Sequence, residues 1–140
     1  MKILLDAMGG DNAPDATIKG AVKAINQIKA EVILIGKQEI IEAKVKEFYG
    51  KTLQEISPRL SIKNATETIE MEDGPTESIR TKKDSSMVVG FSMLKKGEGD
   101  VFISAGNSGA LLAGATLLVG RMVSKPELKQ TEAGKNYASI

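Results

Sequence analysis

The sequence predicts an α/β protein with a mainly parallel sheet, because short apolar runs alternate with segments of helical periodicity. Strands are expected at residues 2–5, 31–35 and 100–104, where short apolar runs lead into turns. The first fifty residues are expected to run strand, helix, strand, helix. This order places successive strands parallel and covers the sheet with helices.

Helices are expected where apolar residues recur every three or four positions. Residues 15–29 show this spacing after Pro14, and residues 37–49 repeat it before Gly50. Residues 84–96 form a third such segment. Residues 110–123 are apolar on nearly every side, which predicts burial on more than one side. That helix is expected in the centre of the core, or against another subunit or a further domain.

The middle and the end of the chain are less regular. Residues 60–65 are expected to form a third strand, and residues 66–72 a short strand or an extended loop. A break at residues 73–75 leads to a short helix at 76–82. Residues 1–123 are thus interpreted as part of one α/β domain. Residues 124–140 lack a periodic apolar face and are interpreted as a loosely ordered tail or the start of a further element.

The composition is that of a globular protein and excludes several kinds of site. The 140 residues are 41% hydrophobic and 26% charged, which suits one domain. The absence of cysteine and histidine removes disulfides, thiolate nucleophiles, Cys/His zinc sites and histidine triads. A net charge of +1 predicts no general attraction to nucleic acid. No metal is expected.

The apolar segments do not predict secretion or a membrane span. Asp6 follows the start of the chain too closely for a signal sequence. The longest apolar stretch, residues 110–120, is shorter than the ~20 residues that a spanning helix needs. A cytoplasmic location is therefore expected.

The strongest candidate site is the loop that contains Ser104, Gly106, Asn107, Ser108 and Gly109. It lies between a predicted strand and a predicted helix, so its free N–H groups lie at the positive end of a helix dipole, which attracts anions. Such a loop can hold phosphate or another anion, with Gly109 keeping side chains out of the backbone cradle. The alternative is that Asn107 or Ser108 only caps the helix.

A second candidate follows the first predicted strand and contains Asp6, Gly9, Gly10 and Asp11. Ligands of open α/β sheets bind beyond the carboxyl ends of the strands, so this turn is expected beside the first candidate. Its acids could orient a ligand or hold a basic side chain. Alternatively, they bond local backbone in a tight turn.

The third candidate is a basic run with Arg80, Lys82 and Lys83, followed by Ser85 and Ser86 at the start of the next helix. Three cations beside a helix start would complement a phosphate or an acidic protein partner. The alternative is a solvated surface without a binding role.

Three motifs together carry a family resemblance. They are D-A-M-G-G-D-N-A-P from residue 6, R-T-K-K-D-S-S-M from residue 80, and S-A-G-N-S-G-A-L from residue 104. In these motifs the sequence resembles the phosphate acyltransferase (PlsX) family of bacterial phospholipid synthesis over about residues 1–123. The family usually has threonine at Ser108. After Arg121 it continues G-I-x-R-P-A, where this chain differs.

The resemblance implies transfer of an acyl group from acyl carrier protein to inorganic phosphate, giving acyl phosphate without a cofactor. It also implies a three-layer α/β/α fold like that of isocitrate and isopropylmalate dehydrogenases, a homodimer, and loose association with the inner face of the membrane. Family members are more than twice as long, so this chain is expected to be a partial domain without activity of its own. The alternatives are a non-catalytic module that binds a phosphorylated ligand, and an inactive truncated fragment.

Overall fold

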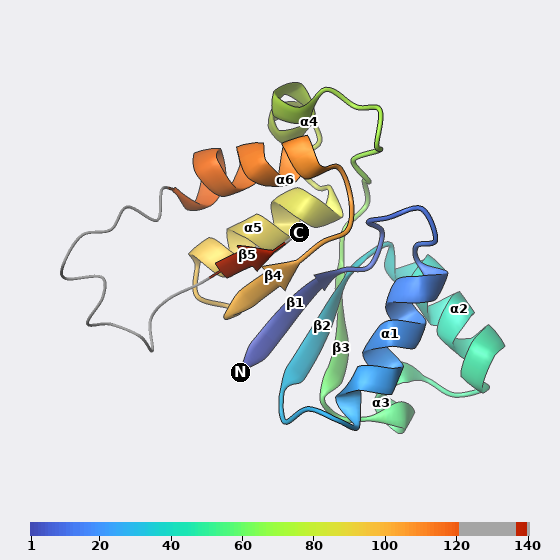
Figure 1. The fold of residues 1–140 in the computed structure, drawn as a ribbon. Coiled ribbons are helices and arrows are strands. Elements are labelled where there is room, and N and C mark those ends of the chain that lie inside the picture. Colours follow the sequence, from blue (N-terminus) through green and yellow to red (C-terminus); the bar gives the residue numbers. More distant parts are fainter. Residues whose placement is uncertain (121–136, 140) are drawn as a thin grey trace, which may run out of the picture.

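A computed structural model describes residues 1–120 and 137–139, which form a five-stranded sheet (Figure 1). Its strands lie in the order β3-β2-β1-β4-β5, and every neighbouring pair is parallel. The strands are β1 (Lys2–Asp6), β2 (Glu31–Gly36), β3 (Leu60–Asn64), β4 (Val101–Ile103) and β5 (Tyr137–Ser139). The predicted parallel α/β arrangement is confirmed.

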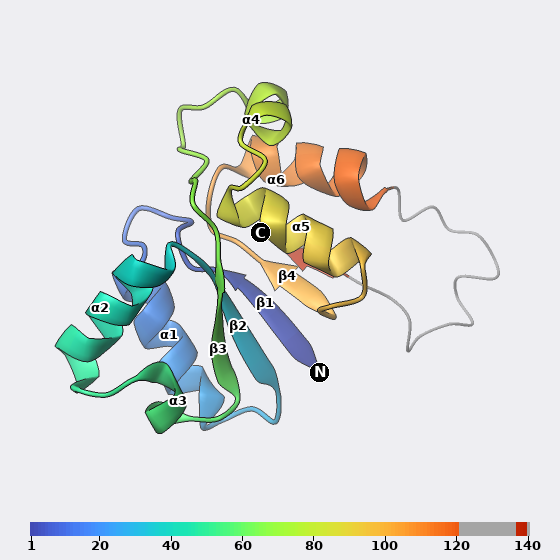
Figure 2. The same ribbon diagram turned by 180° about the vertical axis from the view of Figure 1, so that it is seen from behind.

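Successive strands are added on one side of β1 first and on its other side afterwards, so the strand order reverses between the neighbours β1 and β4. The chain runs outward from β1 to β2 and β3, then crosses back to β4 on the other side of β1. Figure 2 shows the helices of this long crossover on the face opposite α1 and α2. Reversals of this kind open a crevice at the carboxyl ends of the strands, where α/β proteins bind ligands.

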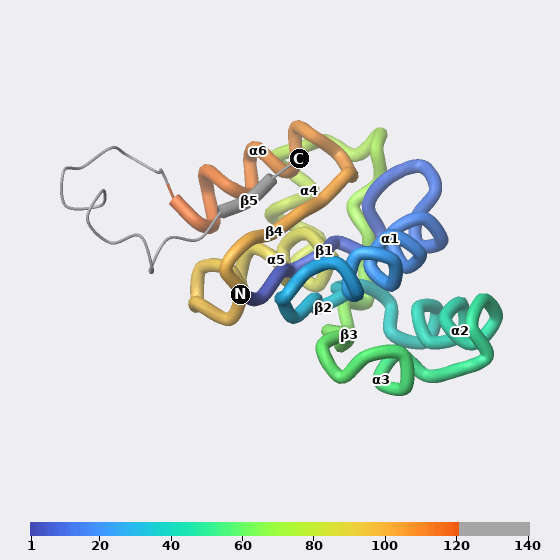
Figure 3. Tube along the Cα trace, turned by 60° about the horizontal axis from the view of Figure 1, so that its bottom comes forward, coloured from blue at the N-terminus to red at the C-terminus, as the bar shows by residue number. Residues whose placement is uncertain are grey.

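One helical layer consists of α1 (Asp15–Ile25), α2 (Gln38–Tyr49) and the short α3 (Leu53–Ile56). Figure 3 shows this layer gathered on the side of the sheet that carries β2 and β3. The helices and strands on this side share one apolar cluster. Its buried members are Ala7, Ile18, Ala21, Ile25, Val32, Leu34, Ile41, Val45, Leu53 and Leu60.

Two features of this layer differ from the sequence-based expectation. Helix α1 ends at Ile25, not at residue 29, and the Arg59 guanidinium donates to the carbonyls of Ile25 and Ile28 at 2.7 and 2.5 Å. Helix α3 was not expected. The capping box of Thr52 and Glu55 forms its start, and this spacing is visible in the sequence.

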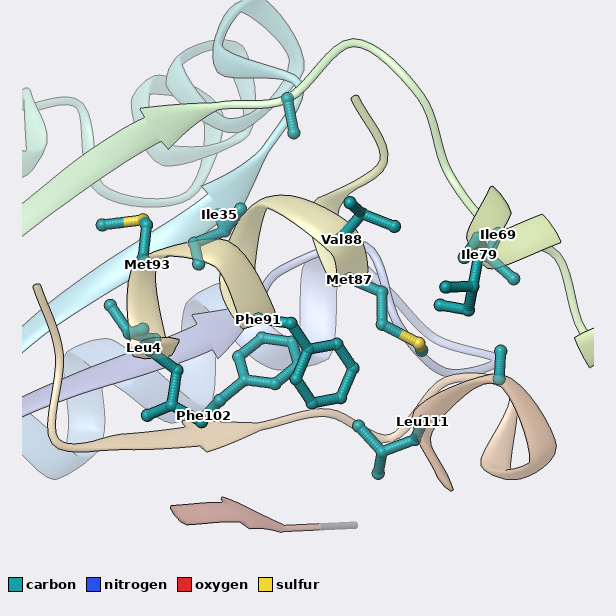
Figure 4. Close-up of a cluster of buried hydrophobic side chains, with 13 residues drawn as sticks. Leu4, Ile35, Ile69, Ile79, Met87, Val88, Phe91, Met93, Phe102 and Leu111 are labelled. Atoms are coloured by element: carbon teal, nitrogen blue, oxygen red, sulfur yellow. The ribbon is translucent and has the colours of Figure 1, made fainter. Parts of the chain in front are cut away.

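The second layer contains α4 (Pro75–Thr81), α5 (Ser86–Lys95) and α6 (Ser108–Gly114), which continues as the π-helical turn η1 (Ala115–Val119). Phe91 of α5 meets Phe102 of β4 edge to face, with ring centroids 5.0 Å apart (Figure 4). Ile35 packs into this cluster, whereas the neighbouring Leu34 belongs to the opposite one. The sheet is therefore covered on both faces, which makes three layers.

The helix predicted at residues 110–123 is not a central core helix. It begins at Ser108 and η1 ends before Gly120, while residues 121–123 lie outside the described residues. Leu112 is 68% exposed and Leu117 is 53% exposed. One side of the helix therefore faces solvent in this chain, and burial of that side would need the other subunit or further domain named as the alternative.

The chain after residue 123 is described only in part. Residues 124–136 and 140, on which most of the expected tail falls, lie outside the described residues. Residues 137–139 form β5 beside β4, a strand that the sequence did not predict. Three residues are too few to show a period.

Pro75 was expected within a break but is the first residue of α4. The N–H group at that position would have no partner within the helix, so the absence of this group in proline costs nothing.

Candidate functional site

The loops after β1 and β4 meet at the point where the strand order reverses. Asp6 is the last residue of β1, and Ser104 directly follows β4. The Ser104 hydroxyl donates to Asp6 Oδ2 at 2.8 Å. The predicted juxtaposition of the two loops is therefore confirmed, because parallel neighbours end at the same edge of the sheet.

The glycine pair of the first loop permits close packing against the second. A Cβ atom on Gly9 would lie 2.8 Å from Asp6 Oδ2 and 2.9 Å from the backbone nitrogen of Gly106. Gly10 adopts a φ of 104° beside Ala105. Both glycines thus have a role in joining the two loops, independent of any ligand.

Asp6 joins three segments of the chain. Its side chain also accepts from Ser86 Oγ at 2.6 Å and from the backbone nitrogen of Met8 at 3.1 Å, and the residue is 2% exposed. Burial raises the pKa of Asp6, and the hydrogen bonds from Ser86 and Ser104 oppose this rise only in part. In the described residues no cation pairs with this carboxyl group, so it is a candidate proton-holding group.

The contacts of Asp6 include only part of what the two interpretations of the first loop predicted. The bond from Met8 is the local turn contact that was expected as the alternative. The bonds from Ser86 and Ser104 are long-range contacts that were not expected. Asp11 is exposed on the same loop. A basic side chain held by Asp6 is not found in the described part of the chain.

The basic run divides between two places. Lys82 Nζ pairs with Asp73 Oδ2 at 2.6 Å and donates to the carbonyl of Thr68 at 2.9 Å. This pairing raises the pKa of Lys82 and lowers that of Asp73. Arg80 and Lys83 instead border a groove between helices. Within the described residues, no hydrogen bond or ion pair joins these three cations to the two loops.

The two serines after the basic run begin α5, as expected. Ser85 is the N-cap, and its hydroxyl accepts from the backbone nitrogen of Val88 at 3.2 Å. Ser86 donates to Asp6. Both serines are buried, so their hydroxyl groups serve internal contacts in this structure.

Asn107 has a larger structural role than the sequence indicated. Its Oδ1 accepts from the backbone nitrogen of Ala110, which is the capping role considered as the alternative. Its amide nitrogen donates to the carbonyls of Glu70, Met71 and Asp73 at 3.0–3.3 Å. Sequence reasoning missed residues 70–73 as an anchor for this loop, and the break at residues 73–75 was the only local signal.

Gly109 is needed for a different reason than the sequence suggested. A Cβ atom there would lie 2.7 Å from Cγ of Pro75, so glycine allows α6 to approach α4 closely. Crowding of a backbone cradle is therefore the wrong reason for glycine at this position. A larger side chain would first disturb the contact between the two helices.

The site contains backbone N–H groups that have no acceptor and could donate hydrogen bonds to a ligand. Within the described residues, the amides of residues 107–109 donate to no protein atom, and neither do those of residues 10–12. The two sets belong to the two loops that Asp6 and Ser104 join. Consecutive free amides at a strand-to-helix turn form a cradle suited to an anion such as phosphate.

Other kinds of site are not found in the described part of the chain. No three Asp or Glu residues gather there as metal ligands. None of its helices has the length and apolarity needed to cross a membrane. A groove of about 520 Å³ beyond β2 and β3 is lined by Lys37, Asn64 and Thr66 among others, and contains none of the predicted site residues.

Comparisons with known proteins match almost the whole chain. The family whose model matches residues 1–129 is described as "Fatty acid synthesis protein". A phosphate acyltransferase of Acetivibrio thermocellus is 48% identical over 141 residues, which cover 96% of this chain and 40% of that protein. The phosphate acyltransferase of Clostridioides difficile is 48% identical, with 87% and 34% covered. That of Thermoanaerobacter pseudethanolicus is 44% identical, with 100% and 40% covered.

The chain thus spans about two fifths of the length of these curated relatives. The family match runs through both loops of the anion cradle and the basic run. Together, the match over residues 1–129 and the identities of 44–48% show that this chain belongs to the fatty acid synthesis protein family.

Proposed function

We propose that this chain supplies the phosphate-holding part of an acyltransferase that moves an acyl group from acyl carrier protein to inorganic phosphate. The relatives are named phosphate acyltransferase, which supports the reaction class. The observation that carries the proposal is the set of free amides at residues 107–109, next to a second set at residues 10–12. Backbone donors of this kind suit a phosphate dianion.

The proposed reaction needs no covalent enzyme intermediate. A phosphate oxygen attacks the thioester carbonyl, the new C–O bond forms, and the C–S bond breaks to release the carrier thiol and acyl phosphate. The protein must hold the phosphate, stabilise the oxyanion and align the two reactants. The free amides supply the first of these requirements, and Asp6 holds the two loops in place.

Phosphate binding can be tested at one amide without enlarging a side chain in the core. Ser108 is the first residue of α6, and Asn107 before it has a φ of -58° and a ψ of 109°, outside the helical region that proline disfavours in the preceding residue, so proline fits at position 108. Ser108→Pro removes one amide donor, whereas Ser108→Ala keeps it. Titration calorimetry with inorganic phosphate should show about tenfold weaker binding for Ser108→Pro than for Ser108→Ala. Equal affinities would contradict the cradle.

Catalysis requires a second experiment. The chain alone is expected to form no acyl phosphate from acyl carrier protein thioester, since it spans two fifths of its relatives. A chimera in which residues 1–120 replace the matching part of the Acetivibrio thermocellus relative should be active. Ser108→Pro should lower that activity. An inactive but folded chimera would favour a non-catalytic phosphate-binding module.

The proposal includes a homodimer in the cytoplasm, loosely associated with the membrane. The exposed Leu112 on α6 is the residue chosen to test self-association, because a contact that removes this apolar side chain from water would be favourable. Light scattering should find a dimer, and Leu112→Asp should shift it to monomer. A monodisperse monomer of the unaltered chain would contradict this part of the proposal.

A further inference from the structure

The turn at residues 70–73 is held together by the side chains of Asp73 and Lys82. The backbone nitrogen of Glu70 donates to Asp73 Oδ2 at 2.8 Å, and the backbone nitrogen of Asp73 donates to the carbonyl of Glu70 at 3.2 Å. Lys82 Nζ donates to the same Oδ2 atom at 2.6 Å and to the carbonyl of Thr68 at 2.9 Å. One ammonium group therefore joins the turn to the segment before it, and its charge strengthens both hydrogen bonds.

This turn presents its carbonyl groups to a single side chain. The carbonyls of residues 70, 71 and 73 accept from the Asn107 amide nitrogen at 3.0–3.3 Å. At the other end of that side chain, Oδ1 accepts from the backbone nitrogen of Ala110 at 3.1 Å. Asn107 is 6% exposed, so water competes little with these contacts. The turn thus fixes the side chain of the first of the three residues whose backbone amides have no acceptor in the described chain.

A second contact joins the same segment to the free amides. Pro75 follows the turn by two residues and packs closely against Gly109, where a Cβ atom would lie 2.7 Å from Pro75 Cγ. Residues 70–75 therefore contact the segment at residues 107–109 at both of its ends. Loss of order in the turn would reach these amides, because their neighbours would no longer be fixed.

We propose that Lys82 is a positioning residue for phosphate binding, acting through the turn at residues 70–73 and Asn107 without contact with the phosphate. This inference rests on the proposed function, since it concerns the same free amides. Donors that are already fixed lose little entropy when an anion binds, so a more ordered loop binds phosphate more tightly. The role separates Lys82 from Arg80 and Lys83, whose side chains have no hydrogen bond or ion pair in the described residues.

Lys82→Met and Lys83→Met form a matched pair, because each removes one cation from adjacent positions of the same run. Hydrogen exchange followed by NMR should be about fivefold or more faster at the Ala110 amide in Lys82→Met, since this amide donates to Asn107. Lys83→Met should leave that rate unchanged. Lys82→Arg keeps a cation that can donate to Asp73, so it should retain most of the protection.

The amides of β1 show whether the effect is local. Their exchange should be the same in all three variants and in the unaltered chain, because β1 lies outside the turn and its contacts. Equal acceleration at β1 and at Ala110 in Lys82→Met would mean that Lys82 only stabilises the fold as a whole. That result would overturn the positioning role.

Titration calorimetry with inorganic phosphate gives the second measurement. Lys82→Met should bind phosphate about threefold or more weakly than Lys83→Met, although both variants have lost one positive charge. Lys82→Arg should bind phosphate nearly as well as the unaltered chain. Equal affinities of the two methionine variants would show that net charge alone matters, and would overturn the proposal.

The two measurements separate a failure of this inference from a failure of the proposed function. The inference alone fails if phosphate binds and Ser108→Pro weakens its binding, while exchange at Ala110 is equal in the two methionine variants. The proposed function fails if the unaltered chain binds no phosphate. Faster exchange at Ala110 in Lys82→Met alone would then still show that Lys82 orders this loop, and an unchanged rate would overturn that role as well.

Discussion

Ser104 donates its hydroxyl proton to Asp6 across 2.8 Å and accepts from the backbone nitrogen of Gly106 at 3.1 Å. Ser104→Ala removes both bonds in a buried setting. The free energy of unfolding should fall by about 1–3 kcal/mol, as measured by urea denaturation. Ser108→Ala, at an exposed position of the same loop, should change it by no more than about 0.5 kcal/mol. Equal effects of the two variants would contradict the structural role of Ser104.

Asp6 should make stability depend on pH in the direction opposite to a paired carboxylate. Burial raises the pKa of Asp6 above its ordinary value of 3.8, so the folded chain holds this proton more tightly than the unfolded chain. Its contribution is fully present below pH 3.8 and is lost as pH rises through the raised pKa. The stability of the unaltered chain relative to Asp6→Asn should therefore fall with rising pH. A rise would show that the hydrogen bonds from Ser86 and Ser104 outweigh burial.

Two glycine substitutions should have opposite effects. Gly9→Ala places a methyl group against the Asp6 carboxyl and the backbone of Gly106, and should cost about 1–3 kcal/mol of stability. Gly20→Ala, inside α1 with no atom within 4 Å of the new Cβ, should add about 0.5–1 kcal/mol. Thermal or urea denaturation measures both. A neutral Gly9→Ala would mean that the two loops separate easily.

Asn107→Asp keeps the size of the side chain but replaces its donating amide nitrogen with an oxygen that accepts hydrogen bonds. An ionised carboxylate cannot donate, and it would face the carbonyl oxygens of residues 70, 71 and 73. The variant should be strongly destabilised at neutral pH and should recover in part at low pH, when protonation restores one donor. Asn12→Asp, at an exposed position, is the control. A pH-independent effect of Asn107→Asp would argue against the three-carbonyl contact.

The sequence was most informative where neighbouring residues determine the structure. The apolar runs of β1 and β4 are visible because both faces of a parallel sheet are buried. Two such strands must end at one edge, so the meeting of Asp6 with Ser104 could be expected without coordinates. The helix that follows Ser104 was also predicted, but not its exposed side, since exposure depends on what packs against it.

Contacts between distant segments could not be predicted in this way. Lys82 and Lys83 are adjacent and chemically alike, yet only Lys82 reaches Asp73, because α4 ends at Thr81 and the chain turns there. The amide of Asn107 reaches back 34–37 residues to its carbonyl partners. The spacing of apolar residues carries no information about such a contact. Asn107 was therefore interpreted only from its position at the start of a helix.

The side chain of Asn107 has a mechanical consequence. Its amide nitrogen donates to the carbonyl of Asp73, and the carboxylate of Asp73 pairs with Lys82. Arg80 and Lys83, which border the groove between helices, lie on either side of Lys82 in the sequence. A displacement of the loop at residues 107–109 therefore pulls, through two hydrogen-bonded links, on the segment that carries Arg80 and Lys83. A ligand that displaces the loop at residues 107–109 is therefore expected to shift the position of Lys82 as well.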